Sequence, residues 1–598
     1  MAKVAVLGGG MGGLETAFEL IERGFEVEVF EKGAVFGGKA RSLNRWGTGT
    51  EGRRDLPGEH GFRFFPGFYK HTPDSMTRIT AASGTGTVFD DLVPTIDVTI
   101  AQAGRPFVQV PARFPQSPAE WLAVLKDLHD RAALGIPSDE IDFFIRRMID
   151  VATACQGRLM TTYETTDWWS FIGANTRSEQ YQKILAVGLT RSLVAMRAEQ
   201  SSSRTVGVML LQILIYVIRP GSATDRVLNG PTTDVWIDPW VADLKKKGVT
   251  MHLEAEVTAL GFDGTRITGA TVTMADGSVR NVQADYFVAA MPIERFIPLV
   301  TAPMIAKAPS LAKLHELGVE WMNGMVFYLN RDVPIAQGHI ILVDSTWAIT
   351  CISQPQFWTG VKLSTFGDGS LKGLLSVDIS DWKSKGTYTT TKTAEECSSL
   401  EIARETWAQL KASLPDLTDA DLLHPLDDLT AKSWFLDPDI ETRATEPGVA
   451  ATGNTIGERG LQAAGSVEPS GTRDSDAEPL LINTNGSWYK RPDAATGIPN
   501  LFLAADYVRT NTDLATMEGA NEAGRRAVNA LLVQAGSSAA PCQVWPLEQM
   551  GIFAPFRWLD ALCHALGLPQ IRWGFLWKLA AAVAKFILKV LRKIGVRA

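Results

Sequence analysis

The 598-residue sequence predicts an α/β fold with three parts: a parallel-sheet domain in several pieces, an α+β cap interleaved with it, and a C-terminal amphipathic helical tail. Three observations predict this fold. A strand–glycine loop–helix–strand unit occupies residues 3–31, alternating strands occupy 248–292, and a second strand-to-helix unit occupies 498–530. Because the first and last units lie almost 500 residues apart, distant segments are expected to close one domain.

The first unit has the form of a Rossmann-like dinucleotide site. An apolar strand at residues 4–7 leads into Gly8-x-Gly10-x-x-Gly13 and then into helix-forming residues. The first glycine permits a tight turn, the second lets the backbone approach a pyrophosphate, and the third lets helix pack on strand. The next apolar strand ends in Glu31, 23 residues after Gly8, where a carboxylate accepts hydrogen bonds from ribose hydroxyls.

A second glycine pair follows the second strand, in Gly37-Gly38-Lys39-Ala40-Arg41-Ser42. This segment resembles the G-G-[RK]-x-x-[ST] motif of flavoproteins of the amine oxidase and phytoene desaturase superfamily. The resemblance implies that the segment passes along the pyrophosphate and flavin of FAD. The alternative interpretation is an ordinary glycine-rich turn.

The far end of the chain carries a matching motif. An apolar strand at residues 501–504 runs into Asp506, and a loop leads to Met517-Glu518-Gly519 at the head of a helix. It resembles the closing FAD motif of plant- and cyanobacterial-type phytoene and ζ-carotene desaturases, although Ala505 replaces their usual glycine. The resemblance implies that Asp506 meets the ribityl–pyrophosphate region and that the positive helix N-terminus faces the flavin and favours its anionic reduced form.

The middle stretch completes the expected site. Alternation at residues 251–257 and 267–274 predicts strands, and Asp276-Gly277 predicts a hairpin turn. The resembled family clamps adenine with a valine backbone, which Val257 matches. The resemblance thus implies one FAD site formed by Gly8, Gly10, Gly12, Gly13, Glu31, Lys32, Gly37, Gly38, Lys39, Arg41, Val257, Asp506, Met517, Glu518 and Gly519. No catalytic residue is assigned from sequence.

Residues 51–71 resemble the desaturases' E-x-G-x-H-x-[FI]-x-G-x-Y segment, which runs near the flavin. Glu59-His60-Gly61 with Tyr69 is the nearest match, although the spacing from acid to histidine differs. The alternative is a structural loop with a packed aromatic cluster. Three arginines in this segment are candidates to face phosphate or the polar end of a substrate: Arg53, Arg54 and Arg63.

Composition excludes several classes of protein. Hydrophobic content of 45% and charged content of 21% describe an ordinary globular protein, and a net charge of −8 argues against a nucleic-acid partner. Five scattered cysteines are typical of reduced thiols in a cytoplasmic protein, and eight scattered histidines predict no metal site. Neither a signal peptide nor an apolar run of 18 residues is found, so no transmembrane helix is expected.

The domain boundaries follow from the motifs. The FAD domain is expected at 1–115, 225–300 and 475–535, the cap at 116–224 and 301–474, and the tail at 540–598. Helical spacing marks the first cap segment at 118–134, 140–156 and 205–218, and the second cap segment mixes strands with a helix at 394–414. The apolar helix at 205–218 is either a buried core helix or one wall of a tunnel for an apolar substrate. Residues 453–476 are expected to form a surface loop.

The tail has its own signal. Residues 561–598 contain seven basic residues and no acidic one, with tryptophans at 573 and 577. A basic amphipathic helix on an acidic protein is typical of an interfacial membrane anchor, so peripheral, monotopic membrane association is expected. A helix docked on the protein itself or on a dimer partner is the alternative.

Together these patterns predict an FAD-dependent oxidoreductase. The leading hypothesis is a desaturase that passes hydride from a C–H bond of a long apolar isoprenoid or carotenoid-like substrate to flavin N5, with quinone or oxygen as the electron acceptor. Three alternatives stay open: a flavin amine oxidase, a flavin-dependent isoprenoid isomerase or dehydroxylase, and a non-catalytic membrane-bound FAD protein.

Overall fold

The computed structural model describes residues 1–111, 135–194, 196–219, 221–428, 433–438, 440–442 and 473–575. Three expectations therefore lie outside the described residues, wholly or largely: the helix at 118–134, the loop at 453–476, and the tail beyond residue 575.

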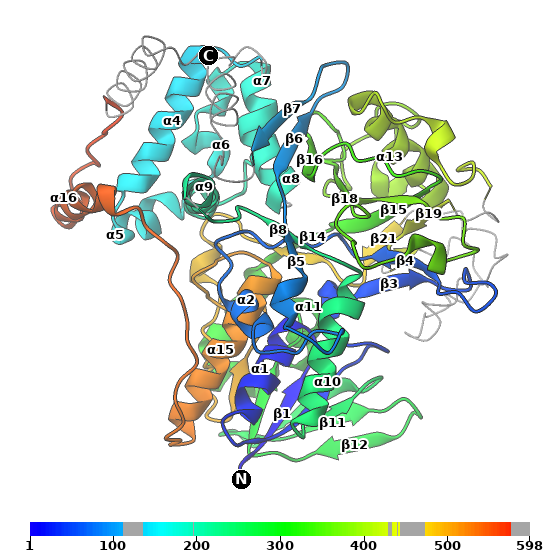
Figure 1. Ribbon diagram of the computed structural model, residues 1–598. Helices are drawn as coiled ribbons and strands as arrows, with labels where there is room; N and C mark the ends of the chain where they lie inside the picture. Colours follow the sequence, from blue (N-terminus) through cyan, green and yellow to red (C-terminus); the bar gives the residue numbers. More distant parts are fainter. Residues whose placement is uncertain are drawn as a thin grey trace.

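The lobe that holds the N-terminus is built on five parallel strands (Figure 1). Their order is β23 (Leu501–Leu503), β13 (Tyr286–Ala289), β1 (Lys3–Leu7), β2 (Glu26–Phe30) and β9 (Thr250–His252). Three helices pack around this sheet: α1 (Met11–Ile21), α10 (Asp238–Lys246) and α15 (Met517–Gln534). Because both faces are covered, the strands β1, β13 and β23 are nearly continuous apolar runs. The predicted α/β fold is confirmed.

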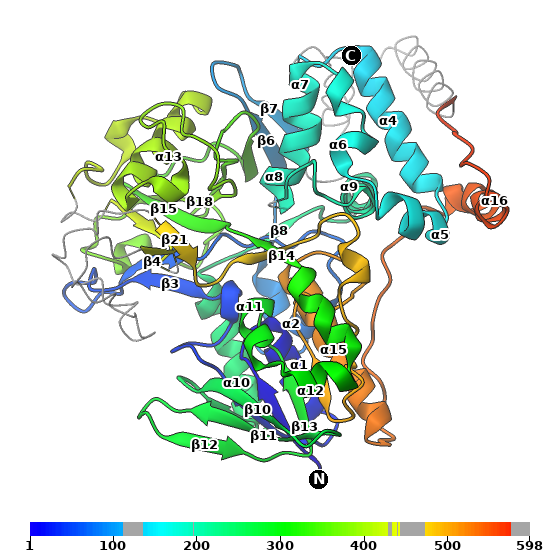
Figure 2. The ribbon, with the colours of Figure 1, turned by 180° about the vertical axis from the view of Figure 1, so that it is seen from behind.

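Distant segments close this sheet, as the motifs predict. Strand β23 pairs with β13, which pairs with β1, so residues 501–503 lie two strands from the N-terminal glycine loop. An antiparallel sheet of β10 (Glu256–Phe262), β11 (Ile267–Thr273) and β12 (Val279–Val282) lies beside it at the base of the molecule (Figure 2).

The cap contains a seven-stranded mixed sheet. Its order is β19 (Trp434–Leu436), β15 (Asn323–Leu329), β18 (Gly373–Ile379), β17 (Thr350–Ser353), β16 (Gly338–Leu342), β6 (Asp97–Ala101) and β7 (Val108–Pro111). Helix α13 (Ser399–Ser413) covers one face, with Trp407 packed on Phe327. Strands β6 and β7 fall inside the range 1–115 expected for the FAD domain, but the structure places them in the cap sheet because β6 pairs in parallel with β16.

The described residues also form four small two-stranded sheets and three further short helices. The sheets pair β3 (Ser42–Arg45) with β4 (Leu56–Glu59), β5 (Leu92–Pro94) with β8 (Arg226–Leu228), β14 (Gly318–Glu320) with β22 (Leu480–Ile482), and β20 (Ile440–Thr442) with β21 (Arg473–Asp476). The short helices are α2 (His71–Met76), α11 (Ile293–Phe296) and α12 (Ala302–Lys307).

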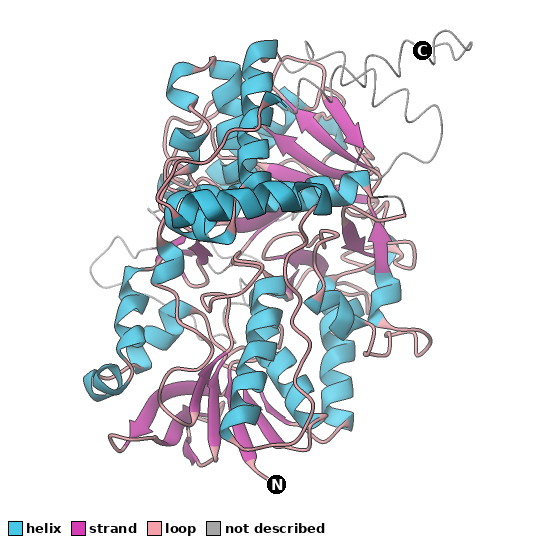
Figure 3. Ribbon diagram, turned by 90° about the vertical axis from the view of Figure 1, so that its left-hand side faces the viewer, coloured by secondary structure: helices cyan, strands magenta, loops and turns pink. Residues whose placement is uncertain are grey.

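A helical lobe forms the rest of the cap (Figures 1 and 3). It comprises α4 (Ser138–Thr153), α5 (Gln156–Arg158), α6 (Trp168–Phe171), α7 (Glu179–Tyr181), α8 (Leu189–Val194), α9 (Ser203–Ile218) and α16 (Ala554–Ala565). The expected helical tail at 540–598 begins differently: residues 541–550 are extended, because Pro541 and Pro546 cannot sit inside a helix. This extended strap joins α15 to α16. Over the described ranges, no helix combines the length and apolar character needed to cross a bilayer.

Candidate functional site

Gly8 makes the tight turn between β1 and α1. Its φ of +119° lies in the region that favours glycine, and a Cβ there would lie 2.5 Å from the Ala290 carbonyl oxygen. Its N–H donates to the carbonyl of Phe30 at 2.8 Å. The turn is therefore fixed against both neighbouring strands.

The next glycines let α1 approach its surroundings. A Cβ on Gly13 would lie 2.0 Å from the Gly8 carbonyl oxygen, and one on Gly12 would lie 1.8 Å from that of Ala504 in the closing segment. A Cβ on Gly10, by contrast, would have the Cα of Gly38 as its nearest neighbour, at 3.6 Å. Among the described residues no side chain caps α1, so its first N–H groups can bind phosphate oxygens.

The second glycine pair lies directly beside the first loop. Gly37 and Gly38 have φ values of +110° and +54°, and the N–H of Gly37 donates to the Gly9 carbonyl at 2.9 Å. A Cβ on Gly38 would lie 3.0 Å from the Cα of Gly10. Two glycine segments thus form a narrow cradle of backbone, the kind of surface that can approach a pyrophosphate closely.

Glu31 lies at the end of this cradle. Its carboxylate accepts hydrogen bonds from the N–H groups of Gly9 at 2.7 Å and Gly33 at 2.6 Å. Burial raises the pKa of Glu31, although these two amides oppose the rise. The carbonyl of Glu31 also accepts from Ala255, which places Val257 nearby. The ammonium of Lys32 pairs with Glu256 at 3.0 Å and so points toward β10 rather than into the cradle.

Lys39 and Arg41 hold a neighbouring segment over the second glycine pair. Lys39 donates to the Pro479 carbonyl and lies 3.4 Å from Glu294. Arg41 donates to the Gly38 carbonyl at 2.9 Å and to Glu478 at 2.8 Å. Burial favours a higher pKa for Glu478, but Arg41 and His60 lower it to about 2. The pair is therefore ionised at neutral pH.

Residues 516–519 of the closing motif begin helix α15 and also bind α2 through Glu518. Helix α15 begins at Met517, and the Thr516 hydroxyl accepts the Gly519 N–H at 3.2 Å as an N-cap. The Glu518 side chain turns away from the cradle and accepts the three first N–H groups of α2, those of Lys70, His71 and Thr72, at 2.6 to 2.8 Å. Its second partner is the His71 ring at 2.8 Å. Glu518 thus fixes α2 against α15.

Arg491 holds the loop that carries Asp506, and sequence reasoning missed it. Its buried guanidinium donates to the carbonyls of Asp506, Tyr507 at 3.1 Å and Val508 at 2.8 Å. It also pairs with Asp513 at 2.6 Å. No motif marks Arg491 in the sequence, because its partners follow it by 15 to 22 residues and are mostly backbone atoms.

Glu59 and Arg63 line one side of a small recess between the lobes, with a cavity volume of about 10 Å³. Its lining includes Glu59, Arg63, Val227, Ile352, Phe357 and Trp358. Burial raises the pKa of Glu59, whose carboxylate accepts from Ser42 at 3.0 Å and from Thr232. Burial lowers the pKa of Arg63, although Glu59 and Asp378 oppose this. The recess is lined by both polar and apolar side chains, with two charged groups in its wall.

The match of residues 59–69 to the desaturase pattern is closer than the histidine implies. With Glu59 as the acid, the remaining positions align without a gap on Gly61, Phe65, Gly67 and Tyr69. Arg63 then stands where the pattern has histidine. His60 has another role, since its ring pairs with Asp437 at 2.6 Å. His60 is therefore part of the contact between the lobes.

The parallel sheet, the glycine cradle and the distant closing unit define a dinucleotide-binding flavoprotein. A profile of the family described as flavin containing amine oxidoreductase matches residues 11–319 and 386–532, and the chain belongs to this family. The cradle, the uncapped helix N-terminus and Glu31 fit FAD, the cofactor of the family. The protein is an FAD-dependent oxidoreductase.

Two curated sequences and one solved structure are similar to this chain over most or half of its length. A probable zeta-carotene desaturase of Synechococcus elongatus is 23% identical over 563 residues, which cover 89% of this chain and 98% of that protein. A zeta-carotene desaturase of Synechocystis is 26% identical over 305 residues, or 49% of this chain and 58% of that protein. Putrescine oxidase bound to putrescine is 14% identical with a TM-score of 0.54, covering 89% of this chain and 99% of that one, a likeness of fold alone.

We expect Gly12→Ala to weaken FAD binding by more than about tenfold, roughly 1.4 kcal/mol. The added methyl would meet the Ala504 carbonyl oxygen at 1.8 Å, so α1 must move away from β23 and open the cradle. Flavin absorbance of the purified protein and FAD titration of the stripped protein measure the effect. Gly360→Ala, where no atom lies within 4 Å of the new methyl, should bind FAD normally. Equal affinity of both variants would contradict the assignment.

Proposed function

We propose that this protein is an FAD-dependent desaturase that acts on a long apolar isoprenoid or carotenoid-like substrate at a membrane. The observation that carries the proposal is the likeness to a probable zeta-carotene desaturase across 98% of that protein's length. Fold likeness to amine oxidases does not select the substrate, because one fold hosts many reactions.

In this proposal the chain holds the cofactor and the substrate in place. The glycine cradle binds the pyrophosphate, Glu31 binds ribose, and the loop at 505–519 closes over the flavin end. Bound FAD supplies hydride acceptance at N5. The segments 1–96, 225–300 and 475–535 form the cofactor domain, and the remaining described segments form the substrate cap.

The recess has a defined part in this proposal. Its apolar side chains are proposed to face the substrate, and at about 10 Å³ the recess must widen for a substrate to enter. Phe357 and Trp358 supply aromatic side chains that would stabilise positive charge developing on carbon when hydride leaves. Arg63 and Glu59 lie at the wall beside the second glycine segment, since Arg63 donates to the Lys39 carbonyl.

Anaerobic reduction of the bound flavin tests the proposal. Phytoene or ζ-carotene in vesicles should bleach the flavin and yield a product with an added C=C bond, and a quinone or oxygen should restore the colour. Rapid bleaching by primary amines, with none by polyenes, would favour an amine oxidase. Rearranged product formed in excess over the flavin, with no added electron acceptor and no bleaching, would favour an isomerase. No reduction by any extracted lipid would favour a non-catalytic FAD protein.

The basic tail is proposed to hold the enzyme at the membrane. Each basic residue near an anionic lipid surface contributes about 1 kcal/mol, and residues 576–598 contain six. Truncation after Phe575 is therefore expected to weaken binding to anionic vesicles and to decrease the sensitivity of the remaining binding to salt, while FAD stays bound. Vesicle flotation at two salt concentrations measures this. Unchanged binding of the truncated chain would contradict an electrostatic role for the tail.

A further inference from the structure

Helix α16 is attached to the protein through its polar side. Asp560 is buried, and its carboxylate pairs with Arg158 at 2.8 Å and accepts the Cys155 N–H at 2.8 Å. One turn later, the His564 ring lies 2.9 Å from the Thr161 hydroxyl. These polar contacts to the α5 region set the rotation of α16 about its axis.

The segment after α16 is fixed in the same way. Arg158 also donates to the Leu568 carbonyl at 3.0 Å. Gln570 accepts from the Tyr163 hydroxyl at 2.5 Å and donates to the Asp150 carbonyl at 2.7 Å. The whole stretch from 554 to 570 is therefore held against α4 and α5 by hydrogen bonds and an ion pair.

The opposite side of α16 carries large apolar side chains into solvent. Trp558, Leu562 and Leu566 follow each other at four-residue spacing and are 71%, 48% and 65% exposed. Four more apolar side chains before and after α16 are exposed: Ile552, Leu568, Ile571 and Phe575. A surface helix in water has the reverse polarity, and a cluster of exposed apolar side chains marks an interaction site.

The charges around this surface are mostly positive, as binding to an anionic lipid interface requires. Asp560 is the only acidic residue after Glu548, and it is neutralised by Arg158 inside the protein. Arg557 and Arg572 lie in the same stretch, and the chain continues into the basic tail. Tryptophan, leucine and basic residues together are typical of interfacial membrane segments. A two-fold contact with a second copy would bring these like-charged basic residues together at one interface.

We propose that the outward face of α16, formed by the seven apolar side chains from Ile552 to Phe575, is a rigid docking surface for an anionic membrane. The surface extends the membrane association proposed for the tail, but it acts through apolar insertion and is held by the folded body. Since α16 packs on α4 and α5, docking fixes the helical lobe of the cap toward the lipid (Figure 3).

Flotation of the full chain with vesicles tests the surface. Leu562→Glu/Leu566→Glu should bind vesicles of phosphatidylcholine and phosphatidylglycerol at least about tenfold more weakly, because two apolar contacts become repelled charges. The control is Val533→Glu on α15, another exposed apolar residue at 83% exposure, which should bind like the parent chain. Bound flavin and melting temperature verify that each variant is folded.

The same variants separate this surface from the tail and from the catalytic proposal. The chain truncated after Phe575 should retain salt-resistant binding that the double substitution removes. Equal vesicle binding by the double variant and the parent chain would overturn the proposal. A concentration-dependent dimer that the double variant abolishes, without vesicle binding, would assign the surface to a second copy. Vesicle binding needs no turnover, so failure of the desaturase hypothesis leaves this result standing.

Discussion

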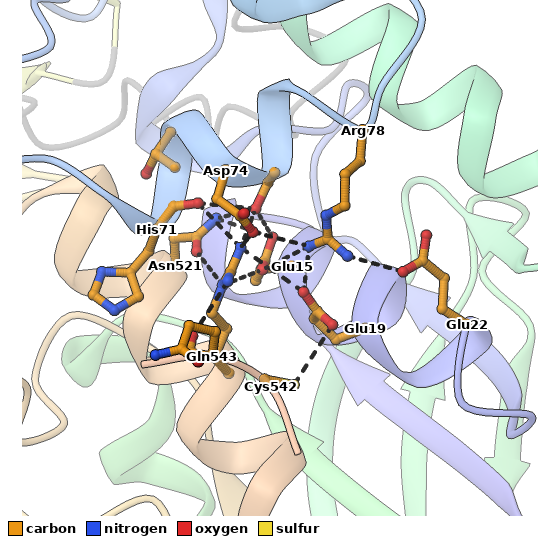
Figure 4. Close-up of polar contacts among 12 residues, drawn as sticks. Glu15, Glu19, Glu22, His71, Asp74, Arg78, Asn521, Cys542 and Gln543 are labelled. Atoms are coloured by element: carbon orange, nitrogen blue, oxygen red, sulfur yellow. Dashed lines mark hydrogen bonds and ion pairs between the residues drawn. The ribbon is translucent and has the colours of Figure 1, made fainter. Parts of the chain in front are cut away.

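Arg525→Met is expected to lower the free energy of unfolding by about 3–5 kcal/mol, because it removes the cation nearest to the buried Glu15 carboxylate and leaves that charge poorly compensated. Arg525 has a 1% exposed side chain and pairs with Glu15 at 2.8 Å and with Asp74 at 2.7 Å. Glu15, Glu19, Asp74 and Arg78 converge on this point from α1 and α2 (Figure 4). The network joins the glycine-loop helix to the helix that closes the site.

The loss should depend on pH in a defined direction. Burial raises the pKa of Glu15 from 4.5 to about 7, while Arg525 lowers it. Removing Arg525 therefore raises the pKa further. A carboxyl with a raised folded pKa binds a proton that the unfolded chain releases, so stability falls as pH rises above 4.5 through the folded pKa. The deficit of the variant should be larger at about pH 8 than at about pH 5.5.

Urea unfolding followed by tryptophan fluorescence measures both effects. Arg404→Met is the control, because Arg404 on α13 is 43% exposed and pairs with Asp427, which is 66% exposed. Its loss should cost no more than about 1 kcal/mol. Glu15→Gln in the Arg525→Met background should recover part of the stability. Equal effects of the two arginine substitutions, or a deficit that grows at acidic pH, would refute the buried-network explanation.

The glycine loop was predictable from sequence because its requirements are local. Gly8 needs a positive φ, and Gly13 must clear the carbonyl of Gly8 five residues earlier. Closure by residues 501–503 was also predictable, since the family motif names both ends. The contact of Gly12 with Ala504 follows from that closure, but only the structure gives its distance.

Other features depend on contacts that no local pattern records. Glu518 lies in the predicted motif, yet its side chain accepts hydrogen bonds from backbone N–H groups at the start of α2, 446 to 448 residues away. Strands β6 and β7 look like a continuation of the first domain, and only pairing with β16 assigns them to the cap. That α16 turns its polar side inward could not be predicted from sequence, because it depends on the ion pair between the buried Asp560 and Arg158. In each case the local sequence fits two roles, and contacts between distant residues determine which role the segment has.

Arg491→Met is expected to reduce FAD affinity by at least about tenfold and to lower the free energy of unfolding by about 3–5 kcal/mol. The side chain supplies three hydrogen bonds to the backbone from Asp506 to Val508 and an ion pair to Asp513. Without it, those carbonyls lose their donors inside the protein, and the loop proposed to contact FAD loses its fixed shape.

The ion pair with Asp513 is one reason why a lysine cannot fully replace Arg491. Asp513 has a φ of +49°, which is unusual for a residue with a side chain, and it is held by Arg491 at 2.6 Å, by the Thr205 hydroxyl at 2.5 Å and by Arg204. A lysine at 491 keeps the charge but has one compact head group in place of a planar fork. Arg491→Lys should therefore recover stability more than it recovers FAD affinity.

That difference separates a positioning role from a purely structural one. Melting temperatures with and without excess FAD, together with FAD titration and the reduction potential of the bound flavin, give the two quantities independently. Lys490→Met is the neighbouring control, since Lys490 is 35% exposed and lies 3.7 Å from Glu316 at the surface. If Arg491→Lys restored stability and affinity in equal proportion and left the potential unchanged, Arg491 would act on folding alone. A shifted potential in a stable lysine variant would instead show that the carbonyls of residues 506–508 must be held in one geometry for the cofactor to work.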